Sequence, residues 1–188
     1  WFHIDLNGKD LYKNRYSRCF GYYFNRAAVA DFQNNRFHLD EKGIRVYNEN
    51  YAWCGNFQEK MCSVRNHNNM YFHIDLFGKH IYNDEYLYAG DYKEGYCCVK
   101  TEKGWKHIDT EGKDLNGKYF KDLGVFHKGF AIAKDTEGWF HIDKQGNELY
   151  KQRYLQIEPF YNGFALVENF NNEKFVLNEN GEIVLRIS

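Results

Sequence analysis

A short motif recurs along the chain at an almost fixed spacing. The tripeptide His-(Ile/Leu)-Asp occurs five times, a degenerate sixth copy reads Val-Leu-Asn, and a glycine follows three residues after each Asp or Asn. The successive periods are 35, 35, 34, 34 and 35 residues, measured between Gly8, Gly43, Gly78, Gly112, Gly146 and Gly181. A fixed period in this range is typical of tandem-repeat proteins, in which each unit buries its apolar face only against its neighbours.

We therefore expect one repeat domain over residues 1–188. Its predicted units are 1–35, 36–70, 71–104, 105–138 and 139–173, followed by a partial cap at 174–188. The cap has lost the histidine of the motif and carries a polar run, Asn178-Glu179-Asn180, which suits an end unit. An open stack needs only contacts between neighbouring units, so it accommodates the leftover half-unit. The alternative is a five- or six-bladed β-propeller.

The motif itself predicts a strand and a turn. Alternation in residues 139–143 puts Phe140 and Ile142 on one face of a strand and Trp139, His141 and Asp143 on the other. In the Asp-x-x-Gly that follows, Asp can accept backbone N–H bonds and Gly can supply a positive φ. We expect a second strand after this turn, as at 46–47, and a further one at 164–167. One proline and no apolar spacing of 3.6 residues favour an all-β, antiparallel hairpin repeat.

A second turn is expected later in each unit, seventeen residues after the marker glycine. Three units have a glycine there, whereas the first two have Asn25 and Lys60. Asn tolerates a positive φ and Lys does so poorly, so we expect the turn around Lys60 to be altered.

The five cysteines fit the repeat register better than a disulfide framework. Cys62 and Cys97 replace an alanine nineteen residues after the marker glycine, and Cys19 and Cys54 share another position. We expect buried thiols that pack as small apolar groups, with a Cys19–Cys54 bridge as the alternative. Unpaired cysteines and the lack of a signal-peptide pattern favour a reducing, intracellular compartment.

Composition excludes several function classes. The 25 Lys and Arg against 26 Asp and Glu leave a formal charge of −1, which gives no basic field for nucleic acid. No run of about 18 apolar residues is present, so no membrane span is expected. Nucleophile-elbow, phosphate-loop, dinucleotide-binding and zinc-protease motifs are absent, so neither an enzyme nor a bound cofactor is expected.

The repeated histidines and aspartates are the feature closest to a reactive site. Stacked units could align them, and His with Asp can bind a transition metal. One histidine per hairpin, however, spaces the ligands more widely than metal bonds of about 2.0–2.1 Å favour, and a residue repeated in register is usually architectural. We therefore predict no metal and assign a structural role to His3, His38, His73, His107, His141, Asp5, Asp40, Asp75, Asp109 and Asp143.

The units resemble the WG repeat family, also called KWG repeats. The segments that carry the resemblance are Gly138-Trp139-Phe140-His141-Ile142-Asp143-Lys144-Gln145-Gly146 and Phe160-Tyr161-Asn162-Gly163-Phe164-Ala165. Two positions depart from the family pattern: Phe140 follows the tryptophan in place of Gly, and His141 replaces the usual aromatic residue. The resemblance implies a non-catalytic β-repeat module, sometimes joined to an enzyme domain, with no catalytic residues to transfer.

Function in a repeat array is expected where the units differ. Ten residues after the marker glycine, successive units carry Arg18, Trp53, Tyr88, Asp122 and Gln156. We take Trp53, Tyr88, Tyr23 and Tyr161 as candidate binding residues. The leading hypothesis is an interaction module or scaffold for a protein partner, or for neighbouring domains of the same polypeptide. The alternative is a carbohydrate or cell-wall binding module that uses these rings.

The histidine content also predicts sensitivity to acid. Protonation of all eight histidines would change the formal charge from −1 to +7. If the register histidines are buried and neutral, the repeats should loosen near pH 5.

Overall fold

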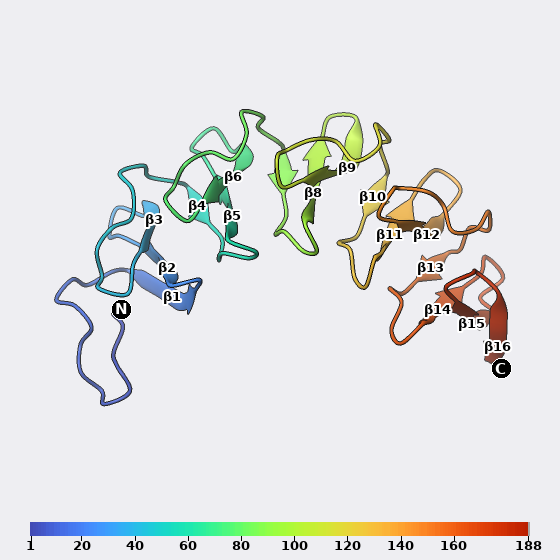
Figure 1. Ribbon diagram of the computed structural model, residues 1–188, viewed down its shortest axis with the longest axis horizontal. Coiled ribbons are helices and arrows are strands. Elements are labelled where there is room, and N and C mark those ends of the chain that lie inside the picture. The colour runs from blue at the N-terminus through green and yellow to red at the C-terminus, as the bar shows by residue number, and fades with distance from the viewer. Residues whose placement is uncertain (188) are drawn as a thin grey trace. The chain divides into compact units, whose positions relative to one another are not determined.

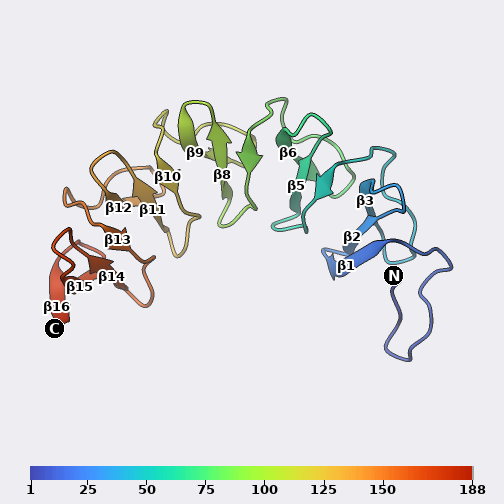
Figure 2. The same cartoon turned by 180° about the vertical axis from the view of Figure 1, so that it is seen from behind.

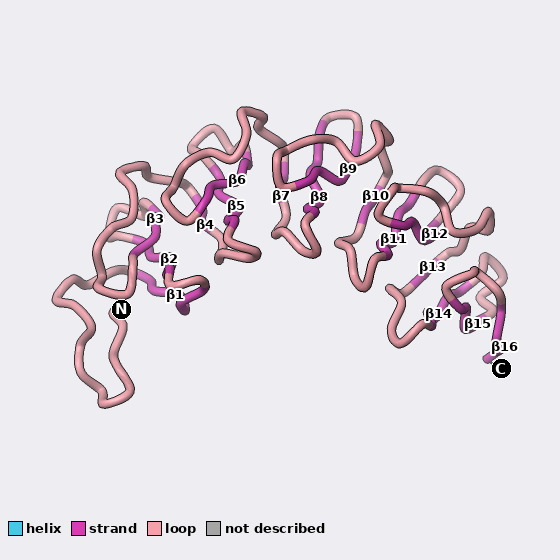
Figure 3. Tube along the Cα trace, in the orientation of Figure 1, coloured by secondary structure: helices cyan, strands magenta, loops and turns pink. Residues whose placement is uncertain are grey.

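The computed structural model describes residues 1–187 as β-strands joined by turns and loops, which confirms the all-β prediction. Figure 3 shows strands and loops but no helix in this part of the chain. Consequently, none of the described residues forms a helix long and apolar enough to cross a membrane.

The chain divides into two compact units, the first ending at Tyr92 and the second beginning at Lys93. The strands of the first unit are β1 (Arg18–Tyr23), β2 (Arg26–Ala30), β3 (Arg36–Leu39), β4 (Trp53–Cys54), β5 (Met61–Arg65), β6 (Tyr71–Asp75) and β7 (Tyr88–Ala89). Those of the second are β8 (Tyr96–Thr101), β9 (Gly104–Asp109), β10 (Asp122–Leu123), β11 (Phe130–Lys134), β12 (Trp139–Asp143), β13 (Gln156–Ile157), β14 (Phe164–Glu168), β15 (Lys174–Asn178) and β16 (Ile183–Ile187).

Within each sheet, strands that follow one another in sequence pair antiparallel. In the first unit, β1-β2-β3 and β4-β5-β6 form two small sheets, and Figures 1 and 2 show them one after the other. The second unit contains the β8-β9 pair, the β10-β11-β12 sheet and the four-stranded β13-β14-β15-β16 sheet. Each three-stranded sheet takes its third strand, which carries the motif histidine, from the start of the next sequence period. Thus His38 of β3 lies opposite Ala28 of β2.

The Asp-x-x-Gly turn forms as predicted. One carboxylate oxygen of Asp40 accepts the N–H groups of Lys42 at 2.9 Å and Ile44 at 2.8 Å, and Gly43 has a φ of +73°. The strand expected after the turn is wrong for this copy, since pairing beyond it is limited to one bridge between Leu39 and Arg45. The chain then leaves the sheet because Tyr47 turns inward, as described below. Within residues 1–187, a full second strand follows the last turn alone, where β16 pairs with β15.

The expectation of an altered turn at Lys60 is also wrong. The Gln58 N–H donates to the Met61 carbonyl at 2.8 Å, the same bond that Lys93 makes to Tyr96 in the next copy. Lys60 adopts a φ of 66° to close this turn. The flanking strands and the fully buried Phe57 hold the backbone in a conformation that the lysine itself disfavours.

The periodic small and aromatic positions form the core. The small residue nineteen positions after each marker glycine is at most 3% exposed in every copy, at Ala27, Cys62, Cys97, Ala131 and Ala165. All five cysteines are free, so the alternative Cys19–Cys54 bridge is absent. Burial raises the pKa of Cys54 and of Cys98 to about 12, which keeps both thiols neutral at physiological pH.

Candidate functional site

The motif histidine connects two neighbouring sheets. In His38, Nε2 lies 3.0 Å from the Gly55 carbonyl oxygen and Nδ1 lies 2.6 Å from the Tyr47 hydroxyl oxygen. Because a carbonyl only accepts, Nε2 carries the proton, and the Tyr47 hydroxyl donates to Nδ1. The His38 ring also packs at 4.8 Å, centroid to centroid, on Phe57, which lies between β4 and β5 of the following sheet.

The same arrangement recurs at the other motif histidines. Their Nε2 atoms lie 2.8–2.9 Å from backbone carbonyl oxygens seventeen residues ahead, at Phe20, Gly90, Gly124 and Glu158. Four rings are at most 3% exposed, and burial lowers their pKa to about 4, at His38, His73, His107 and His141. These imidazoles are therefore neutral at physiological pH, and both ring nitrogens face the protein interior.

The fourth copy departs from this pattern. Asn116 stands where the other copies have a tyrosine, and its side-chain amide donates to the Gly146 carbonyl at 3.3 Å. As a result, Nδ1 of His107 is buried with no hydrogen-bond partner. Among the described residues, this is the only copy in which a motif histidine nitrogen has no hydrogen-bond partner.

The motif aspartates are occupied by their own turns. In each copy one carboxylate oxygen accepts two backbone N–H groups, two and four residues ahead, as Asp143 does from Gln145 at 2.9 Å and Asn147 at 2.8 Å. Among the described residues, no group of three or more His, Cys, Asp and Glu side chains could hold a metal ion.

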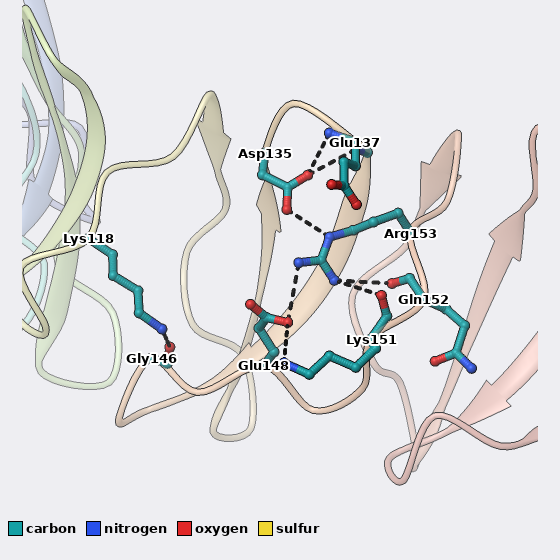
Figure 4. A network of polar contacts seen from close by, with 9 residues as sticks. Lys118, Asp135, Glu137, Gly146, Glu148, Lys151, Gln152 and Arg153 are labelled. Carbon is teal, nitrogen blue, oxygen red and sulfur yellow. Dashed lines mark hydrogen bonds and ion pairs between the residues drawn. The ribbon is translucent and has the colours of Figure 1, made fainter.

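The most extensive ionic cluster also belongs to the scaffold. Arg153 stacks 3.7 Å above the Phe140 ring. Its guanidinium binds Asp135 at 2.8 Å and Glu148 at 3.2 Å (Figure 4). Burial alone would raise the pKa of Glu148, but Arg153 and Lys151 lower it. The cluster fastens a loop over a buried ring, so its polar atoms are already used.

Two of the predicted binding residues share a partner that the sequence argument missed. Trp53 of β4 and Tyr88 of β7 both pack against Tyr71 of β6, at centroid distances of 6.0 and 5.3 Å. Trp53 and Tyr71 are half-buried, and Tyr88 is 43% exposed. The sequence did carry one signal for Tyr71, which is its position in the repeat. An aromatic residue stands two residues before the motif histidine in four of the five copies. We call Trp53, Tyr71 and Tyr88 the aromatic cluster.

A cation accompanies this ring position. Arg65 lies opposite both Trp53 and Tyr71 in the sheet, with its guanidinium carbon 5.7 Å from the Tyr71 centroid. In the second unit, Lys100 over Trp105 and Lys134 over Trp139 repeat the pair, at 5.5 and 5.2 Å. The same strand register thus produces an aromatic ring beside a basic group three times.

The remaining two candidates lie in separate units. Tyr23 ends β1 and is 43% exposed. Tyr161 is 60% exposed in the turn before β14, and its ring lies 5.0 Å from that of His127. The predicted set of four therefore includes one contacting pair, joined through Tyr71, and two further surface rings.

Comparison with known proteins supports the repeat assignment. The family model described as WG containing repeat matches residues 139–173, which confirms the resemblance for that copy. No curated protein matches the chain.

Two solved structures are similar in fold, and a third aligns more weakly. BamB from Moraxella catarrhalis aligns with a TM-score of 0.50 and 14% identity over 96% of this chain, and Hsv2 from Kluyvelomyces marxianus with 0.51 and 11% over 82%. The WD40 beta propeller domain of Doa1 aligns with a TM-score of only 0.40 and 14% identity over 89%. This chain spans 64% of the BamB chain, 57% of the Hsv2 chain and 67% of the Doa1 chain.

Proposed function

We propose that this chain is a non-catalytic repeat module that binds a protein partner, or a neighbouring domain of the same polypeptide, through the aromatic cluster. The observation that carries the proposal is the contact of Trp53 and Tyr88 with Tyr71, because it joins three accessible rings from three strands into one surface. Large rings held by strands lose little conformational entropy on binding, which suits them as interface anchors.

The absence of a catalytic role in this proposal follows from how the polar groups are used. In all copies except the fourth, both ring nitrogens of the motif histidine form hydrogen bonds within the fold. The motif aspartates accept hydrogen bonds from the backbone of their own turns. A general base or nucleophile needs a free atom facing a substrate. The motif histidines face the interior and one oxygen of each motif aspartate is held by its own turn, so these side chains suit a structural role.

The proposal is tested by affinity capture from a cell extract of the source organism. Immobilised wild-type chain is compared with the W53A/Y88A variant and with a matched control, F32A/F77A, which removes two exposed rings of the same unit. The proposal expects a stoichiometric protein with wild type and control and its loss with W53A/Y88A, all three melting alike. Equal capture by all three chains would refute it.

A carbohydrate ligand is the second candidate, favoured by the run of three rings. The rings are tilted by 54° and 49° to one another, so they do not form the flat platform that stacks on successive sugars. A glycan array probed with the same three chains decides this alternative. Binding that only W53A/Y88A loses would support a sugar ligand.

A further inference from the structure

Three arginines lie in the same strand row as the aromatic cluster. In the first sheet, Arg18 of β1 and Arg36 of β3 both lie opposite Ala30 of β2. In the second sheet, Arg65 lies opposite Trp53 and Tyr71. Residues directly opposite one another in a sheet share a face, so Arg18, Ala30 and Arg36 lie on one face of this sheet.

Backbone hydrogen bonds join the two sheets at this row. Arg36 exchanges two bonds with Tyr51, at 3.0 and 2.9 Å, and the Ala52 N–H donates to the Arg65 carbonyl at 2.9 Å. Arg18, Arg36, Arg65 and the aromatic cluster therefore form one continuous row on the first unit, which we call the arginine–aromatic row.

The arginines of this row have no acidic partner. Among described residues, none of the three forms an ion pair, and Nε of Arg36 and of Arg65 is buried with no hydrogen-bond partner. The other arginines use their donors: Arg15, Arg153 and Arg186 bind carboxylates. Arg26 and Arg45 donate to backbone carbonyl oxygens. Arginines without an acidic partner beside accessible rings distinguish this row from the scaffold arginines.

We propose that the arginine–aromatic row binds an acidic segment of the protein partner, with Asp or Glu carboxylates on the guanidinium groups and apolar side chains against the rings. This inference rests on the proposed function and names the partner's chemistry. Arginine presents a planar fork of donors that matches a carboxylate, and it keeps these donors while it stacks on a ring. The whole chain has a charge of −1, so the attraction is local to this row, in contrast to the extended basic field that polyphosphates select.

The test measures fluorescence anisotropy of a labelled random copolymer of glutamate and tyrosine titrated with the full chain. The variants are R18Q, R36Q/R65Q and R36K/R65K, and the matched control is K42Q/K79Q, which removes two exposed charges of the same unit. Heparin, single-stranded DNA and a lysine–tyrosine copolymer serve as comparison ligands. Thermal melting of each chain checks that it is folded, and R18Q changes a side chain that is exposed.

We expect the glutamate–tyrosine copolymer to bind, with weaker binding as salt rises and a dissociation constant about fivefold larger or more in R36Q/R65Q. R36K/R65K should fall between this variant and wild type, R18Q should be weakened, and the control should be unchanged. No copolymer binding, equal binding by all chains, or a preference for heparin or DNA would overturn the inference. It can fail while the capture experiment with W53A/Y88A still succeeds, so the two proposals are separable.

Discussion

The Tyr47 hydroxyl donates a hydrogen bond to Nδ1 of His38, nine residues earlier, across 2.6 Å. The Tyr47 ring also lies on Gly78 of the next repeat, where an added Cβ would be 2.3 Å from a ring carbon. One tyrosine therefore satisfies a buried imidazole of its own repeat and packs on the turn of the following one. It also explains why the marker glycine tolerates no side chain there.

Restoring this tyrosine in the fourth copy should stabilise the protein. In Asn116→Tyr, the new hydroxyl can donate to the unpartnered Nδ1 of His107, and the ring can cover Gly146 as Tyr47 covers Gly78. We expect the free energy of unfolding to rise by about 1–3 kcal/mol, the usual cost of a buried polar group left unsatisfied. Urea denaturation at pH 7.5 measures it.

Two control variants separate the hydroxyl from the ring. Asn116→Phe adds the ring alone and should gain less, whereas Tyr47→Phe should lose about 1–3 kcal/mol because it leaves Nδ1 of His38 without a donor. An Asn116→Tyr protein no more stable than Asn116→Phe would contradict this interpretation.

Acid should destabilise the fold between pH 6.5 and pH 4. Burial lowers the pKa of His38, His73, His107 and His141 from an ordinary 6.5 to about 4 in the folded state. The unfolded chain therefore binds more protons in this window, so the stabilisation is fully present above pH 6.5 and is lost as pH falls towards 4. Melting temperatures measured at intervals from pH 8 to pH 4 should decline in this range.

The His73→Gln variant provides a control for the acid effect. Its amide can still donate to the Gly90 carbonyl and accept from Tyr82, but it does not titrate. We expect the unfolding free energy to depend less steeply on pH, because the variant takes up as much as one proton fewer on unfolding. A wild-type melting temperature that stays constant from pH 8 to pH 5 would rule out the buried, neutral histidines.

The turn at Lys60 should be improved by glycine. Lys60 has a φ of 66°, a conformation that costs a side-chain-bearing residue roughly 1–2 kcal/mol. Part of this gain is offset by the greater freedom of glycine in the unfolded chain, so Lys60→Gly should stabilise by about 0.5–1 kcal/mol. Chemical denaturation compares it with Lys42→Gly, an exposed turn lysine with an ordinary φ, which should be slightly destabilised. Equal losses in both variants would refute the argument.

The sequence predicted the repeat, the strands, the Asp-x-x-Gly turn and the buried small residue of each unit, because each depends on local spacing. The motif Asp and Gly behave as their chemistry requires, as Asp40 and Gly43 show. The strand expected at 46–47 failed because a tertiary contact, the bond of Tyr47 to His38, outweighs continued pairing. Lys60 likewise adopts a positive φ because the strands on either side of its turn fix the backbone there.

The candidate site was predicted in part. Unit-specific variation identified Trp53 and Tyr88, but their link through Tyr71 depends on which strand follows which in space. The unpaired state of Arg36 and Arg65 likewise follows only from knowing their neighbours. Aligning the repeats in the sequence shows which residues occupy equivalent positions. Contacts between successive sheets can be identified only from the three-dimensional structure.

The open stack predicted from the half-unit count is tested by small-angle X-ray scattering. A compact domain of this length has a radius of gyration of about 16 Å. An open array of repeats exceeds that value, with a maximum dimension that grows with repeat number. A radius near 16 Å would favour the closed propeller.

The central claim is that the motif histidines are structural, neutral and protonated on Nε2. Two-bond ¹H–¹⁵N correlation spectra of the imidazole rings at pH 7 test it most directly, because the two nitrogens of each ring give different shifts in each tautomer. The account predicts the neutral Nε2–H form for His38, His73, His107 and His141, held by the carbonyl groups of Gly55, Gly90, Gly124 and Glu158. Charged rings, or protons on Nδ1, would contradict it.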